Sequence, residues 1–381
     1  MELVLLLLAL ATLAYLVFSV IEVQTGLNKI KNLSSQMIVS SPLPSVSIIF
    51  SALNEESVLE NVINALLKLD YPQFEIIVVN DRSTDNTRNI LEKFEHEIRF
   101  QAKHIDYLPK GWLGKNYALH MAAQTAKGEW LLFTDADVVM KSQTLTKSLS
   151  YVIEKQLDHL TIFEHQIRKT FWLKILSLAT YVTYCMGYMP WRASDSRSKK
   201  SVGQGAFNLV KKSVYTSCGG HQAIAMECLD DLQLGALIKR HQFRQDIADG
   251  QDLIEREWYS SAAAMIQGLE KNAFASFHYS FFIFSQSILL AGLFYLWPCI
   301  AALILTGPVQ WLNLLNIMLT TYITLQVCRF FRLSSALAVF YPAGIILLLY
   351  TICHSALVTY RNTGIIWRDT FYSLQELRNK K

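Results

Sequence analysis

Two aspartates separated by one residue, Asp135 and Asp137, follow the apolar segment WLLF at 130–133. Carboxylates at this spacing, where a strand turns into a loop, can face one ion, and their hard oxygens suit Mg²⁺ or Mn²⁺. Such an ion takes its remaining ligands from water and phosphate. The pair therefore predicts a clamp for a metal ion and a diphosphate, although aspartate is also common in solvated turns.

A second acidic pair, Asp230 and Asp231, lies in the segment CLDDLQLG. A carboxylate within hydrogen-bond reach of a hydroxyl can take its proton while a new C–O bond forms. Repulsion from the neighbouring acid would raise the proton affinity of such a base. The alternative is two acids that start a helix and interact with its dipole.

Apolar strands alternate with amphipathic helices around the first pair. The predicted strands are 46–52, 74–81, 99–105 and 129–137, and the predicted helices are 56–69, 114–126 and one capped by Ser83 or Thr84. This alternation predicts an α/β fold with a mainly parallel sheet, whose ligands bind at the carboxyl ends of the strands.

Acidic residues follow three of these strands: Glu55 after the first, Asp81 at the end of the second, and Asp135 with Asp137 after the fourth. Because these ends meet at one edge of a parallel sheet, the pattern indicates a functional site.

The composition divides the chain. It has 381 residues, 52% hydrophobic and 17% charged, and the apolar excess lies in the first twenty and last hundred residues. Segment 2–21 is long enough to span a bilayer. It has no preceding basic residue and no following cleavage site, which favours an uncleaved anchor over a signal peptide. The net charge of +4, without basic runs interleaved with aromatics, argues against nucleic acid as a partner. Six scattered cysteines without a CxxC pair fit a reducing, cytoplasmic side.

The predicted organisation has six parts. They are an anchor at 1–24, a linker at 25–44, the α/β domain at 45–260, an interfacial segment at 261–278, transmembrane helices at 279–360 and a basic tail at 361–381. Lys29 and Lys31 predict that the α/β domain is cytoplasmic. With the C-terminal spans, the chain is expected to be a multi-pass protein of the inner membrane. Segment 170–193 is predicted to be an interfacial helix, with a span as the alternative.

The C-terminal spans leave the topology open. Candidates at 279–306, 311–328 and 335–357, added to the anchor, would place the basic tail outside, against the usual charge bias. Either one candidate is re-entrant or the number of spans differs.

Six segments carry a family resemblance. In chain order they are VSIIFSALNEES, IIVVNDRSTDNT, GWLGKNYAL, WLLFTDADVV, GQGAFNLVKKSVYTSCGGH and CLDDLQLG. Together, over about residues 45–275, they resemble the membrane-bound family 2 glycosyltransferases of GT-A fold. The resemblance is to the bacterial branch that includes hopanoid-associated and carotenoid enzymes. It implies an inverting, metal-dependent transfer, with Mg²⁺ or Mn²⁺, from a UDP-sugar to a lipid acceptor of the polyisoprenoid or glycolipid type at the cytoplasmic face.

The resemblance also implies roles for single residues. Glu55 corresponds to an acid that contacts the nucleotide, Asp81 to the aspartate that hydrogen-bonds uracil, and Lys115 to a basic residue near the nucleotide. A surface lysine at a helix start is the alternative for Lys115. Asp135 and Asp137 correspond to the metal-binding motif. Asp231 corresponds to the catalytic base, with Asp230 beside it in the substrate site.

Three further residues are assigned less directly. Gly205, in GQGAF, lets the backbone approach a sugar closely. Many processive relatives carry QxxRW, whereas this chain has QDLIEREW. Arg256 is still expected to meet the diphosphate and Trp258 to line the acceptor groove. The departure argues against the first alternative, a processive polysaccharide synthase. In the tail, RNTGIIWRDTFY is similar to a family element that follows the last span, with an interfacial anchor as an equal alternative.

Two other functions are alternatives to a glycosyltransferase. A nucleotidyltransferase would carry a phosphate loop where this chain has ALNEES. A non-catalytic, nucleotide-sensing membrane scaffold would have no need of Asp231, so substitution of that residue separates it from an enzyme.

Overall fold

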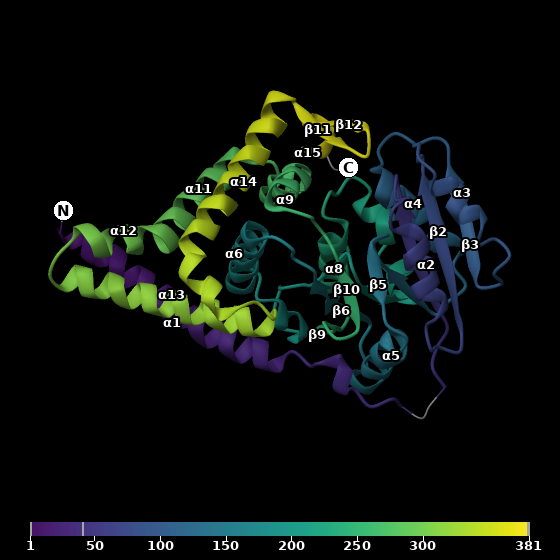
Figure 1. Cartoon of the computed structure of the whole chain (residues 1–381), viewed down its shortest axis with the longest axis horizontal. Helices are drawn as coiled ribbons and strands as arrows, with labels where there is room; N and C mark the ends of the chain where they lie inside the picture. Colours follow the sequence, from purple (N-terminus) through teal and green to yellow (C-terminus); the bar gives the residue numbers. More distant parts are fainter. Residues whose placement is uncertain (1, 40–41, 379–381) are drawn as a thin grey trace.

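The computed structural model describes residues 2–39 and 42–378, so that part of the predicted linker and the last residues of the basic tail, Lys380 and Lys381 included, lie outside it. A seven-stranded sheet forms the centre of the α/β domain (Figure 1). Its strands, in spatial order, are β3 (Phe100–Ile105), β2 (Phe74–Asp81), β1 (Val46–Ala52), β4 (Trp130–Phe133), β8 (Asn208–Lys211), β6 (His159–Phe163) and β9 (Gln245–Asp249). β8 runs antiparallel to both neighbours and the other pairs are parallel, which confirms the predicted α/β fold class.

The sheet is buried on both faces because its strands are apolar at successive positions. In β1, Ile48 and Phe50 pack into one hydrophobic cluster and Ile49 packs into the cluster on the opposite face. The helices of the domain are α2 (Leu59–Leu67), α3 (Thr87–Glu92), α4 (Gly114–Thr125), α5 (Thr144–Lys155), α6 (Phe171–Gly187), α7 (Lys212–Ser217) and α8 (Asp230–Arg240). The carboxyl ends of β1, β2 and β4 meet at one edge, as the strand pattern predicts.

Two local predictions are wrong. Neither Ser83 nor Thr84 caps α3, because both residues bind Asn54 in another loop. Ser83 Oγ accepts a hydrogen bond from Asn54 N (3.1 Å), and Thr84 N donates to Asn54 Oδ1 (2.8 Å). The fourth strand ends at Phe133 and not at Asp137. The two aspartates instead lie in a turn between β4 and β5 (Val138–Met140), a strand of a second sheet.

That second sheet is small, and it joins the segment after the two aspartates to the strand that carries Arg256. It pairs β5 with β10 (Ile254–Arg256), and β10 with β7 (His165–Gln166). Arg256 lies opposite Val138, one residue beyond Asp137. The pairing therefore brings Arg256 to the aspartate turn from about 120 residues away in the sequence.

Within residues 2–39 and 42–378, four helices are long and apolar enough to cross a membrane: Glu2–Lys29, Phe281–Ile304, Pro308–Phe330 and Ser335–Arg361. In detail they comprise α1 (Glu2–Lys29), α11 (Phe281–Ala291), α12 (Trp297–Ile304), α13 (Pro308–Phe330) and α14 (Tyr341–Arg361). A π-helical turn at Gly292–Leu296 joins α11 to α12 just before Pro298, whose missing N–H interrupts the regular ladder. Figure 1 shows α1, α12 and α13 extending away from the sheet, with α14 nearer to it.

The predicted interfacial stretches form shorter pieces. Segment 170–193 becomes α6 and a 3₁₀ turn at Pro190–Ser194, separated at Met189, whose φ is positive. One side of α6 packs in a cluster with α1, α13 and α14, through residues such as Leu16, Val327 and Ile345. Residues 261–278 form α9 (Ala262–Gly268), α10 (Glu270–Ala273) and a 3₁₀ turn. Whether these stretches lie in a membrane interface stays a prediction.

The tail returns to the α/β domain. After α14 the chain forms a hairpin of β11 (Gly364–Trp367) and β12 (Thr370–Ser373), followed by α15 (Leu374–Arg378). Trp367 and Tyr372 of this hairpin pack with Leu113, in the loop before α4. The hairpin thus lies beside the edge of the sheet where the acidic residues gather.

Candidate active site

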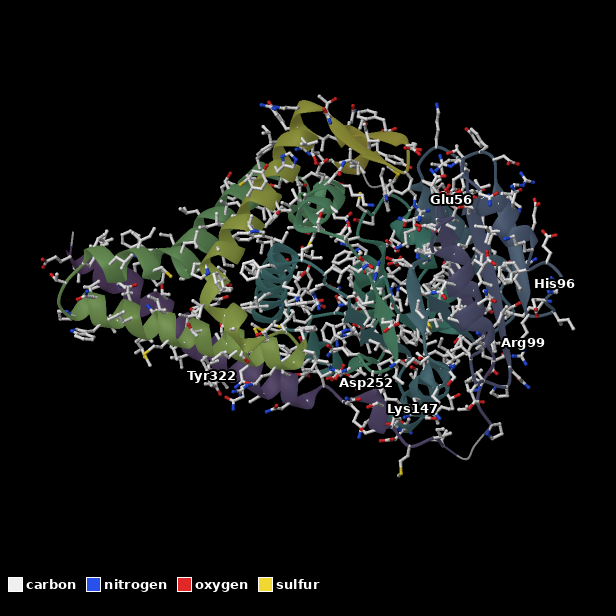
Figure 2. All side chains as sticks on the ribbon, viewed as in Figure 1. Glu56, His96, Arg99, Lys147, Asp252 and Tyr322 are labelled. Carbon is white, nitrogen blue, oxygen red and sulfur yellow. The ribbon has the colours of Figure 1, made fainter. Side chains whose placement is uncertain are left out.

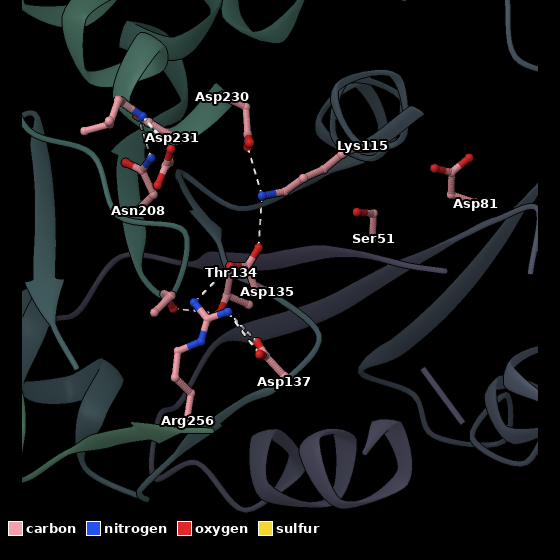
Figure 3. A network of polar contacts seen from close by, with 12 residues as sticks. Ser51, Asp81, Lys115, Thr134, Asp135, Asp137, Asn208, Asp230, Asp231 and Arg256 are labelled. Atoms are coloured by element: carbon pink, nitrogen blue, oxygen red, sulfur yellow. Dashed lines mark hydrogen bonds and ion pairs between the residues drawn. The ribbon is translucent and has the colours of Figure 1, made fainter. Parts of the chain in front are cut away.

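The turn after β4 is held by one arginine. Arg256 Nη1 donates to Asp135 Oδ2 (3.1 Å), and Nη2 lies 3.0 Å from the Asp137 carboxylate (Figure 3). The Thr134 hydroxyl donates to the Ala206 carbonyl oxygen (2.7 Å) and fixes the start of the turn. Asp135, Asp137 and Arg256 are therefore brought together, and one guanidinium contacts both carboxylates.

Lys115 connects the two acidic pairs. Its Nζ lies 2.9 Å from Asp135 Oδ1 and 3.1 Å from Asp230 Oδ2, as Figure 3 shows. Its side chain is only 13% exposed, so the alternative of an exposed helix-start lysine is wrong. Lys115 sits in the first turn of α4, and Asp230 begins α8. The two helix starts are thus joined by one ammonium group.

The charges shift the acidity of the turn in opposite directions. Burial opposes ionisation of Asp135, but the charges of Lys115 and Arg256 outweigh it and hold the pKa of Asp135 below its usual range. Burial raises the pKa of Asp137, with Asp135 adding to the rise and Arg256 opposing it. Burial raises the pKa of Glu55 to about 7, and the charge of Asp137 contributes.

Asp231 has the acidity that suits a base near neutral pH. Burial, followed by the charge of Asp230, raises its pKa to about 6. Its Oδ1 accepts a hydrogen bond from the backbone N–H of Leu232 (2.8 Å). The charge of Lys115 opposes the rise in the pKa of Asp231. Among the described residues, Lys115 forms an ion pair with Asp230 and none with Asp231.

Gly205 lies directly against the aspartate turn. A Cβ at this position would lie 2.5 Å from Asp135 Oδ2, closer than van der Waals contact allows. The structure therefore explains a glycine here by the approach of the backbone to Asp135. Contact of Gly205 with a sugar stays a prediction.

Asp81 lies beneath the site and not on its surface. It is fully buried, and its two oxygens accept hydrogen bonds from Arg82 Nε (2.8 Å) and Arg368 Nη1 (3.0 Å). Figure 3 shows it beyond Ser51, away from the aspartate turn. Contact between Asp81 and a nucleobase stays a prediction and would require one of the two arginines to move.

These groups surround a cavity of about 660 Å³. Six acidic side chains and four basic ones line it: Glu55, Asp135, Asp137, Glu164, Asp230, Asp231, Lys115, Arg256, Lys271 and Arg368. Trp258 also lines the cavity, and its ring lies 5.5 Å from the Arg256 guanidinium carbon. All the predicted site residues except Asp81 thus border one space.

Several lining residues were not predicted. Thr180 and Tyr184 on α6, and Tyr188 directly after it, recur every four residues and form one wall with Tyr181. The sequence does not reveal this role, because a helix whose aromatic residues face a polar cavity has the same composition as one whose aromatic residues face lipid. Lys271 lies in a segment assigned to the membrane interface. Arg368 lies in the quoted tail motif, whose position no local pattern reveals.

The comparisons with known proteins agree with this geometry. Residues 47–215 match the sequence model of the family described as Glycosyl transferase family 2. Over 118 residues the chain is 32% identical to poly(ribitol-phosphate) beta-N-acetylglucosaminyltransferase TarS of Staphylococcus aureus, which is 30% of this chain and 20% of that protein. Over 234 residues it is 25% identical to 4,4'-diaponeurosporenoate glycosyltransferase of Staphylococcus haemolyticus, with 60% of each chain covered. The chain thus spans from a fifth to three fifths of these relatives.

The fold is similar to that of a solved enzyme. The structure titled mannosyltransferase PcManGT from Pyrobaculum calidifontis, in complex with GDP-Man and Mn²⁺, superimposes with a TM-score of 0.54 at 15% identity. The match covers 94% of this chain and 98% of that chain. The predicted family resemblance and the predicted GT-A type of α/β fold are confirmed.

Replacing Lys115 by methionine is expected to destabilise the protein. Removing one partner of a buried ion pair costs about 3–5 kcal/mol, because charges are left uncompensated. The loss should be largest at neutral and higher pH, where the carboxylates are ionised. It should shrink as the pH falls, because Asp135, without the charge of Lys115 that lowers its pKa, can then bind a proton. Thermal unfolding of the detergent-solubilised protein between pH 5 and 8 measures this.

Lys110→Met is the matched control, because Lys110 is exposed in the loop before α4. Its unfolding temperature should stay at the wild-type value. A Lys115→Met protein as stable as this control at pH 8 would contradict the bridging role.

Proposed function

We propose that the protein transfers a sugar from a UDP-sugar to a hydroxyl of a membrane lipid at the cytoplasmic face. The proposal starts from residues 47–215, which match the family 2 glycosyltransferase model. The observation that carries this proposal is the single cavity bordered by Asp135, Asp137 and Asp231 on one side and by the tyrosines of α6 on another. The first group suits a donor diphosphate and proton removal. The second lies on a helix whose other side packs among the apolar helices.

The donor set of the aspartate turn fits a divalent cation. Asp135 and Asp137 offer hard carboxylate oxygens, and both border the cavity. Among residues 2–39 and 42–378 no three His, Cys, Asp or Glu side chains converge on a point, so other ligands would come from the diphosphate and water. Bound Mg²⁺ or Mn²⁺ would supply charge stabilisation for the departing diphosphate. Arg256, which now pairs with both aspartates, is suited to a diphosphate as well, since a guanidinium binds phosphate with two parallel hydrogen bonds.

The acceptor is activated by Asp231 in this proposal. A lipid hydroxyl is a poor nucleophile, and Asp231 takes its proton as the new C–O bond forms. One attack from the face opposite the leaving group inverts the anomeric centre. Lys115 forms ion pairs with both Asp230 and Asp135, so that the helix start that carries the base is held next to the donor.

Release of UDP by the purified, detergent-solubilised protein tests the function. A panel of UDP-sugars and GDP-sugars is tested with total membrane lipid, with Mn²⁺ or with EDTA. We expect nucleotide release that needs both metal and lipid. Asp137→Ala should abolish it, because one carboxylate of the clamp is lost, and the exposed Asp106→Ala serves as control.

Other outcomes change the assignment. Release without lipid would indicate hydrolysis or a soluble acceptor, and a growing polymer would indicate a processive synthase. No release by folded protein with any donor would contradict an enzymatic role.

The pH dependence should report the base. Since Asp231 must be ionised to accept a proton and its pKa is raised to about 6, the rate should fall as the pH drops through 6. Asp231→Asn should lower the rate by about 10²- to 10⁴-fold, the usual contribution of a general base, and should leave UDP binding intact. Glu55 also titrates near neutral pH, so Glu55→Gln is the matched variant. If the acidic limb disappears in Glu55→Gln, the limb belongs to Glu55 and not to Asp231.

We further propose that α14 does not cross the membrane, which returns the basic tail to the cytoplasmic side. Just before this helix, Arg332 pairs with Asp252 of the α/β domain at 2.6 and 2.7 Å. Asp252 lies at the edge of that domain in Figure 2. Just after the helix, Arg368 pairs with Asp81. Both flanks of α14 therefore bind the same domain, and three spans remain: α1, α11 with α12, and α13.

Epitope tags placed at three points test this topology. A tag after Lys381 and a tag at the exposed Ile98 of the α/β domain should be digested by protease from the same face of membrane vesicles. A tag between α12 and α13, at Thr306, should be digested only from the opposite face. Protection of the C-terminal tag together with the Thr306 tag would show that α14 crosses.

A further inference from the structure

The C-terminal hairpin places an arginine in its turn. β11 and β12 pair from Gly364 with Ser373 to Trp367 with Thr370, so Arg368 and Asp369 form the two-residue turn. Both have positive φ, 51° and 56°, as hairpin turns with matching twist require. Glycine and asparagine are the usual residues there because side chains oppose this conformation. An arginine in this position indicates that its contacts compensate for the backbone.

The hairpin is anchored to the loops that carry the site. Arg82 Nη1 donates to Thr370 Oγ1 (3.0 Å), and the backbone N–H of Gly114 donates to the Tyr372 hydroxyl (3.2 Å). Gly114 also permits the close packing, because a Cβ there would lie 2.5 Å from Asp81 Oδ2. Lys115 follows directly. The hairpin is therefore seated on the residues that place Asp81 and Lys115.

Arg368 faces the cavity from this seat. Its Nη1 donates to Asp81 Oδ2 and its Nη2 to Ser51 Oγ, each at 3.0 Å. Arg368 and Ser51 line the cavity, whereas Asp81 is fully buried behind them. Asp81 thus orients the guanidinium, and what the cavity presents on this side is the positive charge.

Lys271 adds a second cation to the same wall. Its Nζ lies 4.8 Å from the centre of the Trp367 ring, and both residues line the cavity. No described carboxylate lies within ion-pair distance of Lys271. Burial, followed by the charge of Arg368, lowers its pKa to about 8. A buried ammonium beside an arginine, without a paired carboxylate, is suited to an anionic ligand.

We propose that Arg368 and Lys271 bind the diphosphate of the sugar donor, so that the C-terminal hairpin completes the donor site. This inference rests on the proposed function. The diphosphate would lie between two walls of the cavity: the aspartate turn, with its metal ion, and the pair of cations. Residues from both halves of the chain would then be needed for donor binding, and the α/β domain alone would lack half of the positive charge that faces the phosphates.

Nucleotide binding by full-length, detergent-solubilised protein tests the proposal. UDP and GDP are titrated in the presence of Mn²⁺, and the corresponding nucleoside is measured by competition. Arg368→Gln should weaken binding of the diphosphate about 10- to 100-fold, the range expected for losing charge-assisted hydrogen bonds. Lys271→Gln should weaken diphosphate binding about 5- to 30-fold, because an ammonium group is a less directional hydrogen-bond donor than a guanidinium. Neither should change nucleoside binding more than twofold.

Arg361→Gln is the matched control, because it removes the same charge from an exposed position at the end of α14. It should bind like the wild type. Arg368→Lys keeps the charge but not the paired contacts to Asp81 and Ser51, and should bind between wild type and Arg368→Gln. Unfolding temperatures show whether each variant is folded, and if Arg368→Gln unfolds, Lys271→Gln decides.

The outcomes distinguish a failure of the proposed function from a failure of the inference about Arg368 and Lys271. A wild type that binds no nucleoside diphosphate contradicts the proposed function, and the inference falls with it. A wild type that binds, with folded Arg368→Gln or Lys271→Gln binding equally well, overturns the inference alone. Equal loss of nucleoside and diphosphate binding would assign the hairpin to the nucleobase and overturn the diphosphate contact.

Discussion

Carboxylates that share a poorly solvated cavity repel one another, and they stay ionised only when cations lie between them. The site of this protein depends on that constraint. Asp135, Asp137 and Asp230 would be costly to bury together without Lys115 and Arg256, which contact them at 2.9–3.1 Å. The placement of the two cations is therefore as much a part of the architecture as the acids. Each cation comes from a separate element, so the charges also fasten those elements together.

The constraint also separates the acids by their tasks. Asp135, with two cations, is held ionised, whereas Asp231, buried and next to Asp230, has a pKa raised to about 6. One stays charged at any physiological pH and suits a permanent contact with a metal ion or cation. The other can gain and lose a proton near neutrality. Environment and not residue type assigns the roles, since all are aspartates.

The sequence predicted what depends on neighbours along the chain. β1, β2 and β4 are continuous apolar runs, and the acidic residues follow them directly, so the acidic edge of the sheet could be inferred from Glu55, Asp81 and Asp135. The predicted cap of α3 was wrong because Ser83 and Thr84 form hydrogen bonds with Asn54 of another loop. Arg256 was expected near a diphosphate, but its pairing with both aspartates depends on the register of β10 against β5. Lys271 and Arg368 were missed as site residues because nothing local distinguishes them from basic residues at a membrane surface.

Arg368 shows most clearly why such contacts escape a reading of the sequence. It is 287 residues from Asp81, and the apolar helices lie between them in the chain. The contact exists because α14 carries the chain back along α6, where Gly344 approaches the carbonyl oxygen of Ile175 closely enough that a Cβ would lie 2.9 Å from it. Helices that look like simple membrane anchors therefore determine where the tail ends. A substitution at the α6–α14 contact, far from any acidic residue, would shift the hairpin and with it the charge that faces Asp81. The packing of the apolar helices therefore determines the position of a charged group in the polar site.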